Sequence, residues 1–233
     1  MIGDIDNAIQ LATTLICAIV ALFRAVKFKG RRWALLGLFS GLFFLGTLYY
    51  QVFFLFYDET PLYLSIADLS WYTSYLFLLM LVIYVNVHNR EVDMQTSRKQ
   101  GAFAEMDRNI LRWARRSNPV IWIVPTFTIT MFFIFIQRGD YLLNFIVLVL
   151  MTGIMWHSVY GLVTIQSNPQ RKQRQQMLFV VTFLFCLTEY ALWVSSLFWT
   201  GYTITNNYFW FDFLLSAMFL LFIPAVGRTV SEK

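Results

Sequence analysis

The chain has 233 residues, of which 58% are hydrophobic, 19% are aromatic and only 13% are charged. Soluble domains carry about a quarter charged residues, and a globule in water could not hide this much apolar surface. The composition therefore excludes a water-exposed globular domain, a disordered chain and a disulfide-stabilised secreted scaffold. It indicates a protein that has lipid as its solvent.

Seven apolar stretches are long enough to cross a hydrocarbon core of about 30 Å, which takes about 20 helical residues. In chain order they cover residues 6–26, 33–57, 62–87, 119–137, 141–165, 177–200 and 208–227. We therefore predict an all-α polytopic membrane protein whose residues 1–233 form a single domain of seven transmembrane helices.

The odd number of spans permits an arrangement of three helices, one linking helix and three further helices. A shift of 144 residues places Asp68 over Asp212 and Leu76 over Leu220, but few other identities support this register. An internal repeat is therefore only weakly indicated.

The basic residues are confined to one side of this arrangement. Seventeen of the 18 Lys and Arg residues lie in or beside the connectors at 27–32, 88–118 and 166–176 or in the carboxyl-terminal tail, and only Arg138 lies on the other side. Because cytoplasmic loops are enriched in Lys and Arg, we predict an external amino terminus and a cytoplasmic carboxyl terminus, in the plasma membrane. The net charge of +5 thus reflects topology, and we expect no nucleic-acid partner.

The connector at 88–118 contains a short amphipathic segment, in which apolar residues recur at helical spacing beside basic ones. The apolar residues are Phe103, Met106, Ile110 and Trp113, and the basic ones are Arg108, Arg112, Arg115 and Arg116. We predict a helix over about 103–116 that lies on the inner leaflet, with Trp113 at the depth of the headgroups. A docking helix for a cytoplasmic protein partner is the alternative.

Three carboxylates lie inside the apolar stretches, namely Asp68, Glu189 and Asp212. A charged carboxylate at the centre of a span costs at least ~2.5–3.5 kcal/mol. Protonating an Asp at pH 7 costs about 4 kcal/mol. Since the two costs are comparable, each acid is neutral and hydrogen-bonded, hydrated in a cavity open to the outside, or paired with a bound cation. A proton, a sodium ion and an organic amine all fit the last case.

Aromatic side chains accompany these acids at helical spacing, and Trp and Tyr rings attract cations. We predict an outward-facing acidic cavity with Asp68, Glu189 and Asp212 as ligands and with Trp71, Tyr72 and Trp193 as aromatic walls. The alternative is that polar residues only hold the helices together, that Tyr and Trp line the membrane interfaces, and that Asp68 and Asp212 stay hydrated.

His157 lies in the inner half of the fifth span, on one face with Tyr160, Gly161 and Thr164. We predict that it relays protons between Glu189 and the cytoplasm. A single hydrogen bond between helices is the simpler alternative.

The sequence lacks the motifs of membrane-embedded hydrolases. Neither G-x-S-x-G nor H-E-x-x-H occurs, two histidines are too few for a three-histidine zinc site, and Cys17 and Cys186 lie in apolar runs as packing residues. We therefore expect no metal and no cofactor, and a role other than catalysis. The predicted function is binding or transport of a small cationic or proton-coupled solute. A non-catalytic sensor or structural subunit of a membrane complex, acting through the 88–118 connector, is the alternative.

Overall fold

The computed structural model describes residues 2–57, 65–98, 119–136, 141–164, 169–196 and 204–230. Within these ranges the chain forms seven α-helices and no strand, which confirms the predicted all-α fold. The helices are α1 (Ile2–Phe28), α2 (Arg31–Tyr57), α3 (Ile66–Arg98), α5 (Pro119–Ile136), α6 (Tyr141–Thr164), α7 (Pro169–Ser195) and α8 (Asn207–Val230). The predicted amphipathic helix at 103–116 lies outside the described residues.

Six of the described helices are long and apolar enough to cross a membrane. In α5 the described apolar stretch is Ile123–Phe133, which covers about 16 Å at 1.5 Å per residue. Large apolar side chains face outward, with Val26 81% exposed and Leu55 79% exposed. Such a surface suits lipid, so six spans follow from length and composition, whereas the seventh span and the orientation in the membrane remain predictions.

Two helices extend beyond their predicted spans. Helix α3 continues to Arg98 and α7 begins at Pro169, so parts of both polar connectors are helical. Neither Gly nor Pro interrupts residues 88–98, and proline is favoured in the first turn of a helix, where no backbone N–H bond is lost. The apolar run marks the membrane crossing, whereas the helix ends depend on these local signals.

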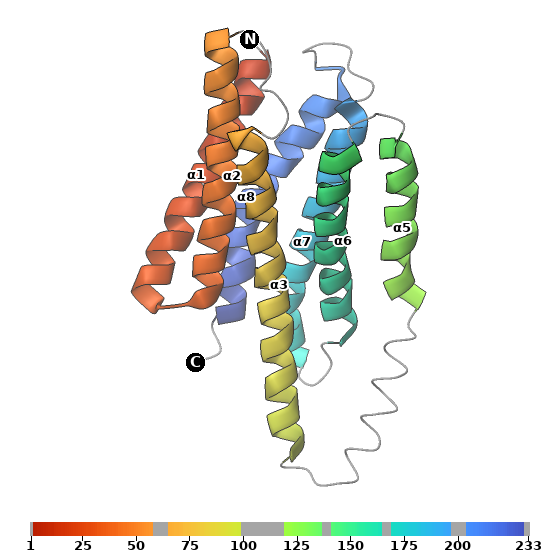
Figure 1. Ribbon diagram of the computed structural model, residues 1–233. Coiled ribbons are helices and arrows are strands. Elements are labelled where there is room, and N and C mark those ends of the chain that lie inside the picture. The colour runs from red at the N-terminus through yellow and green to blue at the C-terminus, as the bar shows by residue number, and fades with distance from the viewer. Residues whose placement is uncertain are drawn as a thin grey trace.

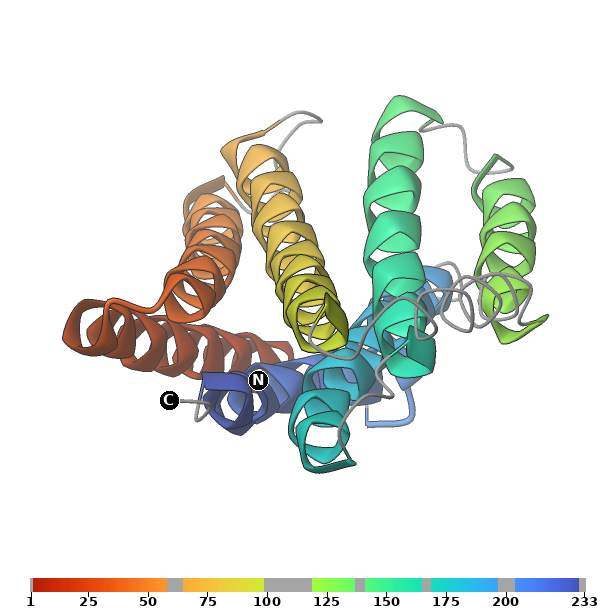
Figure 2. The ribbon, with the colours of Figure 1, turned by 90° about the horizontal axis from the view of Figure 1, so that it is seen from below.

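Six helices form a ring in which each packs against the next, in the order α1, α2, α3, α6, α7, α8 and back to α1. Helix α2 also contacts α8 across the ring, and α5 packs on the outside against α6 (Figure 2). Helices α1–α3 and α6–α8 thus form two sets of three, with α5 between them in sequence. This agrees with the predicted arrangement of three, one and three helices.

The two termini lie at opposite ends of the molecule (Figure 1). The end of α1, the starts of α2 and α7 and the end of α8 all lie at the carboxyl-terminal end. Every Lys and Arg of the described residues falls in these regions or in the last turns of α3, so we call this the basic end. The opposite end, near which Asp6, Asp68 and Asp212 lie, is called the acidic end.

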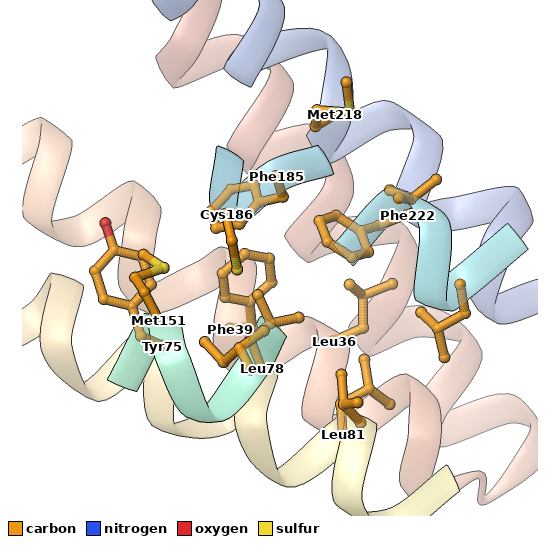
Figure 3. Close-up of a cluster of buried hydrophobic side chains, with 14 of the residues drawn as sticks. Leu36, Phe39, Tyr75, Leu78, Leu81, Met151, Phe185, Cys186, Met218 and Phe222 are labelled. Atoms are coloured by element: carbon orange, nitrogen blue, oxygen red, sulfur yellow. The ribbon is translucent and has the colours of Figure 1, made fainter. Parts of the chain in front are cut away.

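Phenylalanine side chains fill the middle of the ring. The Phe39 ring on α2 stacks on Phe219 at 5.2 Å and meets Phe185 and Phe222 edge-on at 5.4 and 5.5 Å. Phe43, one turn from Phe39, lies 4.8 Å from Phe219. These five rings, which we call the aromatic core, come from α2, α7 and α8, and Figure 3 shows Phe39, Phe185 and Phe222 facing one another. They contribute a large part of the buried core and carry no polar atom.

Gly161 lets α6 approach its neighbours closely. A Cβ atom at this position would lie 2.5 Å from the Phe179 ring of α7 and 2.8 Å from Oδ1 of Asn86 on α3. At Gly153, also on α6, the nearest atom is a methyl group of Leu79 at 3.4 Å. The contact between α3, α6 and α7 therefore requires glycine at 161 and tolerates alanine at 153.

We expect Gly161→Ala to destabilise the protein by about 1–3 kcal/mol, because the added methyl group overpacks the contact with Phe179. Thermal unfolding in mild detergent measures the effect. Gly153→Ala is the matched control and should leave the melting temperature unchanged or slightly higher, since alanine favours the helix. Equal melting temperatures for the two variants would contradict the packing at Gly161.

Candidate functional site

Two carboxylates are buried on neighbouring helices, Glu189 on α7 and Asp212 on α8, and each is only 3% exposed. Helix α7 ends at Ser195, so Glu189 lies about 9 Å from the end of its helix, nearer to the acidic end than the predicted midplane position. Asp212 lies about 8 Å from the start of α8. The two acids therefore lie at similar depth in two antiparallel helices.

Each of the two acids accepts a hydrogen bond from a neutral side chain on another helix. The Tyr75 hydroxyl of α3 donates to Oε1 of Glu189 at 2.9 Å. The Gln10 amide of α1 donates to Oδ1 of Asp212 at 2.5 Å. One oxygen of each carboxylate is thus occupied, and four helices meet at the pair.

The second oxygens of the two acids remain for other partners. Glu189 and Asp212 interact electrostatically with each other, and Asp212 also interacts with Asp6, one turn before Gln10. Ser216 follows Asp212 by one turn on the same face of α8. It is 1% exposed, and its hydroxyl has no hydrogen-bond partner within the described residues. We call Asp6, Gln10, Tyr75, Glu189, Asp212 and Ser216 the acidic site.

Basic side chains do not reach this half of the described bundle. Every Lys and Arg of the described residues lies at the basic end or in the last turns of α3. When Glu189 and Asp212 are ionised, their charge is therefore not balanced by a cationic side chain of these helices. Among the described residues, no three His, Cys, Asp or Glu side chains are grouped so that they could hold a metal ion.

Asp68 has a local structural role at the start of α3. Its Oδ2 accepts bonds from the Ser65 backbone N–H at 2.9 Å and from the Ser65 hydroxyl at 3.0 Å. The Ser65 hydroxyl in turn accepts a bond from the Asp68 backbone N–H at 3.3 Å. This reciprocal pattern is a capping box, which satisfies the free N–H groups of a helix start. The structure accounts for Asp68 through this cap rather than through a bond to Glu189 or Asp212.

The predicted aromatic walls lie in different surroundings. Trp71 is wedged between α2 and α3, with its indole N–H 3.4 Å from the Thr47 hydroxyl and its ring 5.9 Å from Tyr50. Tyr72 is half-buried and interacts electrostatically with Asp68. Trp193 is half-buried and packs against the core. The aromatic residue that bonds to a buried acid is Tyr75, which the sequence did not single out.

His157 lies on α6, and its backbone carbonyl accepts a bond from the Asn86 amide of α3 at 2.8 Å. Its Nδ1 is buried and has no hydrogen-bond partner in the described part of the chain. The hydrogen bond that Glu189 makes goes to Tyr75. The proton relay through His157 therefore stays a prediction.

The sequence did not single out Gln10, Tyr75, Asp6 or Ser216 as site residues. Gln10 and Ser216 are polar residues inside apolar stretches, and Tyr75 lies two turns after Asp68. A polar residue in an apolar stretch is expected to face the interior of the bundle. The sequence does not show which acid it contacts there. The structure shows that Gln10 of α1 donates to Asp212 of α8, and that Tyr75 of α3 donates to Glu189 of α7.

The long apolar helices and their apolar outer surface define an all-helical, multi-pass membrane protein. Comparisons with protein-family models, curated proteins and solved structures give no match. Its function is therefore argued from the acidic site itself.

We expect Asp68→Ala to lower the stability by about 1 kcal/mol, because the first turn of α3 loses its cap. Ser65→Ala should cost a similar amount, and the double variant should cost little more than either, since both changes remove the same bonds. Thermal unfolding of the three variants in detergent measures this. Fully additive losses would contradict the capping box.

Proposed function

We propose that this protein binds or transports a small cation, or a solute coupled to protons, at the acidic site. The observation that carries the proposal is the Glu189–Asp212 pair, two carboxylates buried on adjacent helices away from every described basic side chain. Buried charge is costly unless it is paired. Two neighbouring carboxylates also repel each other, so a bound proton or cation between them relieves both costs.

The donors around the pair favour a small cation with oxygen ligands. Tyr75 and Gln10 each occupy one carboxylate oxygen, which leaves the other oxygen of Glu189 and of Asp212. The hydroxyl of Ser216 adds a third oxygen on the same face of α8. A proton, a sodium ion or a small amine suits such a set of oxygen atoms.

The site is closed in this conformation, because both acids are 3% exposed. Phe185 lies one turn from Glu189 towards the basic end, and Phe219 lies two turns from Asp212 in the same direction. The aromatic core therefore separates the acidic site from the basic end. Transport requires this core to open, whereas binding alone requires only movement at the acidic end.

The proposal includes three further predicted residues, namely Asp68, Tyr72 and His157. Asp68 and Tyr72 interact near the start of α3, at the acidic end. In the predicted orientation this end faces outside the plasma membrane, where the Asp68 charge attracts cations towards Tyr72 and Tyr75. In the proton-coupled version of the proposal, His157 provides a further titratable group on the path to the basic end.

We expect Glu189→Gln to weaken cation- or proton-dependent behaviour by at least about tenfold, because a charge-assisted contact is worth ~1.5–3 kcal/mol. The protein is reconstituted in liposomes, and proton flux and the uptake of sodium and small amines are measured. Ligand-dependent melting in detergent provides the binding measurement. Asp212→Asn should have a similar effect.

The matched control is Glu91→Gln, which removes the same charge from an exposed position on α3 towards the basic end. It should leave flux and binding unchanged. If the Glu189→Gln variant keeps the full flux of protons and cations and its ligand-dependent melting is unchanged, the proposal is wrong.

A second function is favoured by the length of α3. The membrane-crossing part of this helix is Ile66–Asn89, but the helix continues to Arg98, about 13 Å further. In Figure 1 it projects beyond the other helices at the basic end. Such a projection offers a binding surface for a protein partner, which suits a sensor or a structural subunit of a membrane complex.

If the projection binds a partner, the protein purified in mild detergent should carry a second protein at a fixed stoichiometry. Val92→Pro, which breaks the helix after the membrane-crossing part, should release that protein, and Val92→Ala should retain it. Analytical size-exclusion chromatography with mass determination measures the ratio. A monodisperse protein without a partner, with cation-dependent melting, would rule out the second function.

A further inference from the structure

Positive charge accumulates where α1, α2 and α8 meet at the basic end. Neither residues 7–57 nor residues 213–230 contain an Asp or Glu. The same stretches contain the basic residues Arg24, Lys27, Lys29, Arg31, Arg32 and Arg228. The carboxylates of α1 and α8 are Asp4, Asp6 and Asp212, which belong to the opposite halves of these helices. These three helices thus supply no carboxylate to balance the cations.

One of these basic residues is used within the fold. Arg32 is buried, and its guanidinium donates to the backbone carbonyl of Thr229 in the last turn of α8. Because the last carbonyls of a helix have no partner within the helix, this bond caps α8 and joins it to α2. Arg32 therefore has an acceptor from the protein itself.

Arg24 is positioned by packing but has no hydrogen-bond acceptor among the described residues. Its guanidinium lies over the Trp33 ring of α2, 4.7 Å from the centroid, and Trp33 is only 2% exposed. An Nη1 atom of Arg24 lies 3.4 Å from where a Cβ at Gly227 of α8 would be. Residues from three helices thus surround this half-buried side chain. Because the face of the guanidinium stacks on Trp33, the N–H groups at its edge remain able to donate hydrogen bonds. No described residue accepts a hydrogen bond from them.

The surroundings of Arg24 show what kind of anion fits. Arg24 lies four residues before the end of α1, about 6 Å inside the helix end. If α1 crosses the membrane over Ile5–Phe28, Arg24 lies near the boundary between headgroups and acyl chains. Its neighbours Phe23, Val26 and Phe28 are 65%, 81% and 53% exposed, so they face lipid. Lys27 follows Arg24 by three residues, on the same side of α1, and is exposed. A phosphate carried on apolar chains matches both the cations and the apolar surface around them.

We propose that Arg24 and Lys27 bind the phosphate of an anionic lipid at the junction of α1, α2 and α8. The Arg24 guanidinium donates to the phosphate oxygens, while Trp33 holds its plane in place. Lys27 adds a second positive charge, and the acyl chains lie along Phe23 and Val26. The lipid supplies the acceptor that the described residues do not.

The test measures lipid binding to the purified, delipidated full chain. Native mass spectrometry counts the bound lipids after phosphatidylglycerol or phosphatidylcholine is added back, and a titration gives the affinity for phosphatidylglycerol. The wild-type protein should retain phosphatidylglycerol in preference to phosphatidylcholine. Arg24→Gln should weaken phosphatidylglycerol binding by at least about tenfold, because it removes charge-assisted hydrogen bonds.

The matched control is Arg31→Gln, which removes the same charge from an exposed position at the same end. It should cost at most about fivefold, the effect of one basic residue near an anionic membrane surface. Arg24→Lys keeps the positive charge but loses the planar guanidinium with its paired N–H donors. This variant should bind phosphatidylglycerol with an affinity between those of the wild type and Arg24→Gln. Melting temperatures will show whether Arg24→Gln is folded. If it is not, the comparison of Arg24→Lys with the wild type tests the proposal instead.

Three results would overturn the proposal. Equal losses of phosphatidylglycerol affinity for Arg24→Gln and Arg31→Gln would mean that the lipid is attracted by the overall positive charge of this end rather than by a site at Arg24. Equal retention of phosphatidylcholine would mean that the lipid charge is not recognised. Displacement of phosphatidylglycerol by excess inorganic phosphate would mean that the site binds a free anion rather than a lipid.

Discussion

The structure depends on one constraint, which is that polar groups inside the membrane must find partners within the protein. Most hydroxyl groups meet it within their own helix. Ser40 donates to the carbonyl of Leu36 at 2.8 Å, and Thr182 donates to the carbonyl of Leu178 at 2.8 Å. A carboxylate cannot donate in this way. Glu189 and Asp212 therefore bond to side chains of other helices and link α3 with α7 and α1 with α8.

These two links explain how the ring of helices is held at its acidic end. Helices α1 and α8 are neighbours in the ring although they lie at opposite ends of the sequence, and the Gln10–Asp212 bond lies at their contact. The middle of the ring is filled by the aromatic core, which uses rings that need no hydrogen bond. A cation that binds Glu189 or Asp212 acts on residues that hold helices together. A cation that occupied the proposed site would therefore link its binding to movement of these helices.

The sequence predicted the helices well because long apolar runs leave few alternatives in a membrane. It misplaced the ends of α3 and α7, because polar residues such as those at 88–98 continue a helix without any apolar signal. Asp68 was predicted as a site residue, and the structure shows that it also forms a capping box with Ser65, three residues earlier. The pairing of Gln10 with Asp212 joins residues 202 positions apart, so it required the three-dimensional arrangement.

The same constraint accounts for both proposed sites, which lie in opposite halves of the molecule. The Glu189–Asp212 pair has neutral donors but no cation from the described helices, and Arg24 has an aromatic support but no acceptor from them. A charged group near lipid that the fold orients but does not neutralise needs a counter-charge from outside the chain. The two proposals therefore assign a cation or a proton to the acidic pair and an anion to Arg24. Because the aromatic core separates the two sites, changes at Arg24 and at Glu189 should have independent effects.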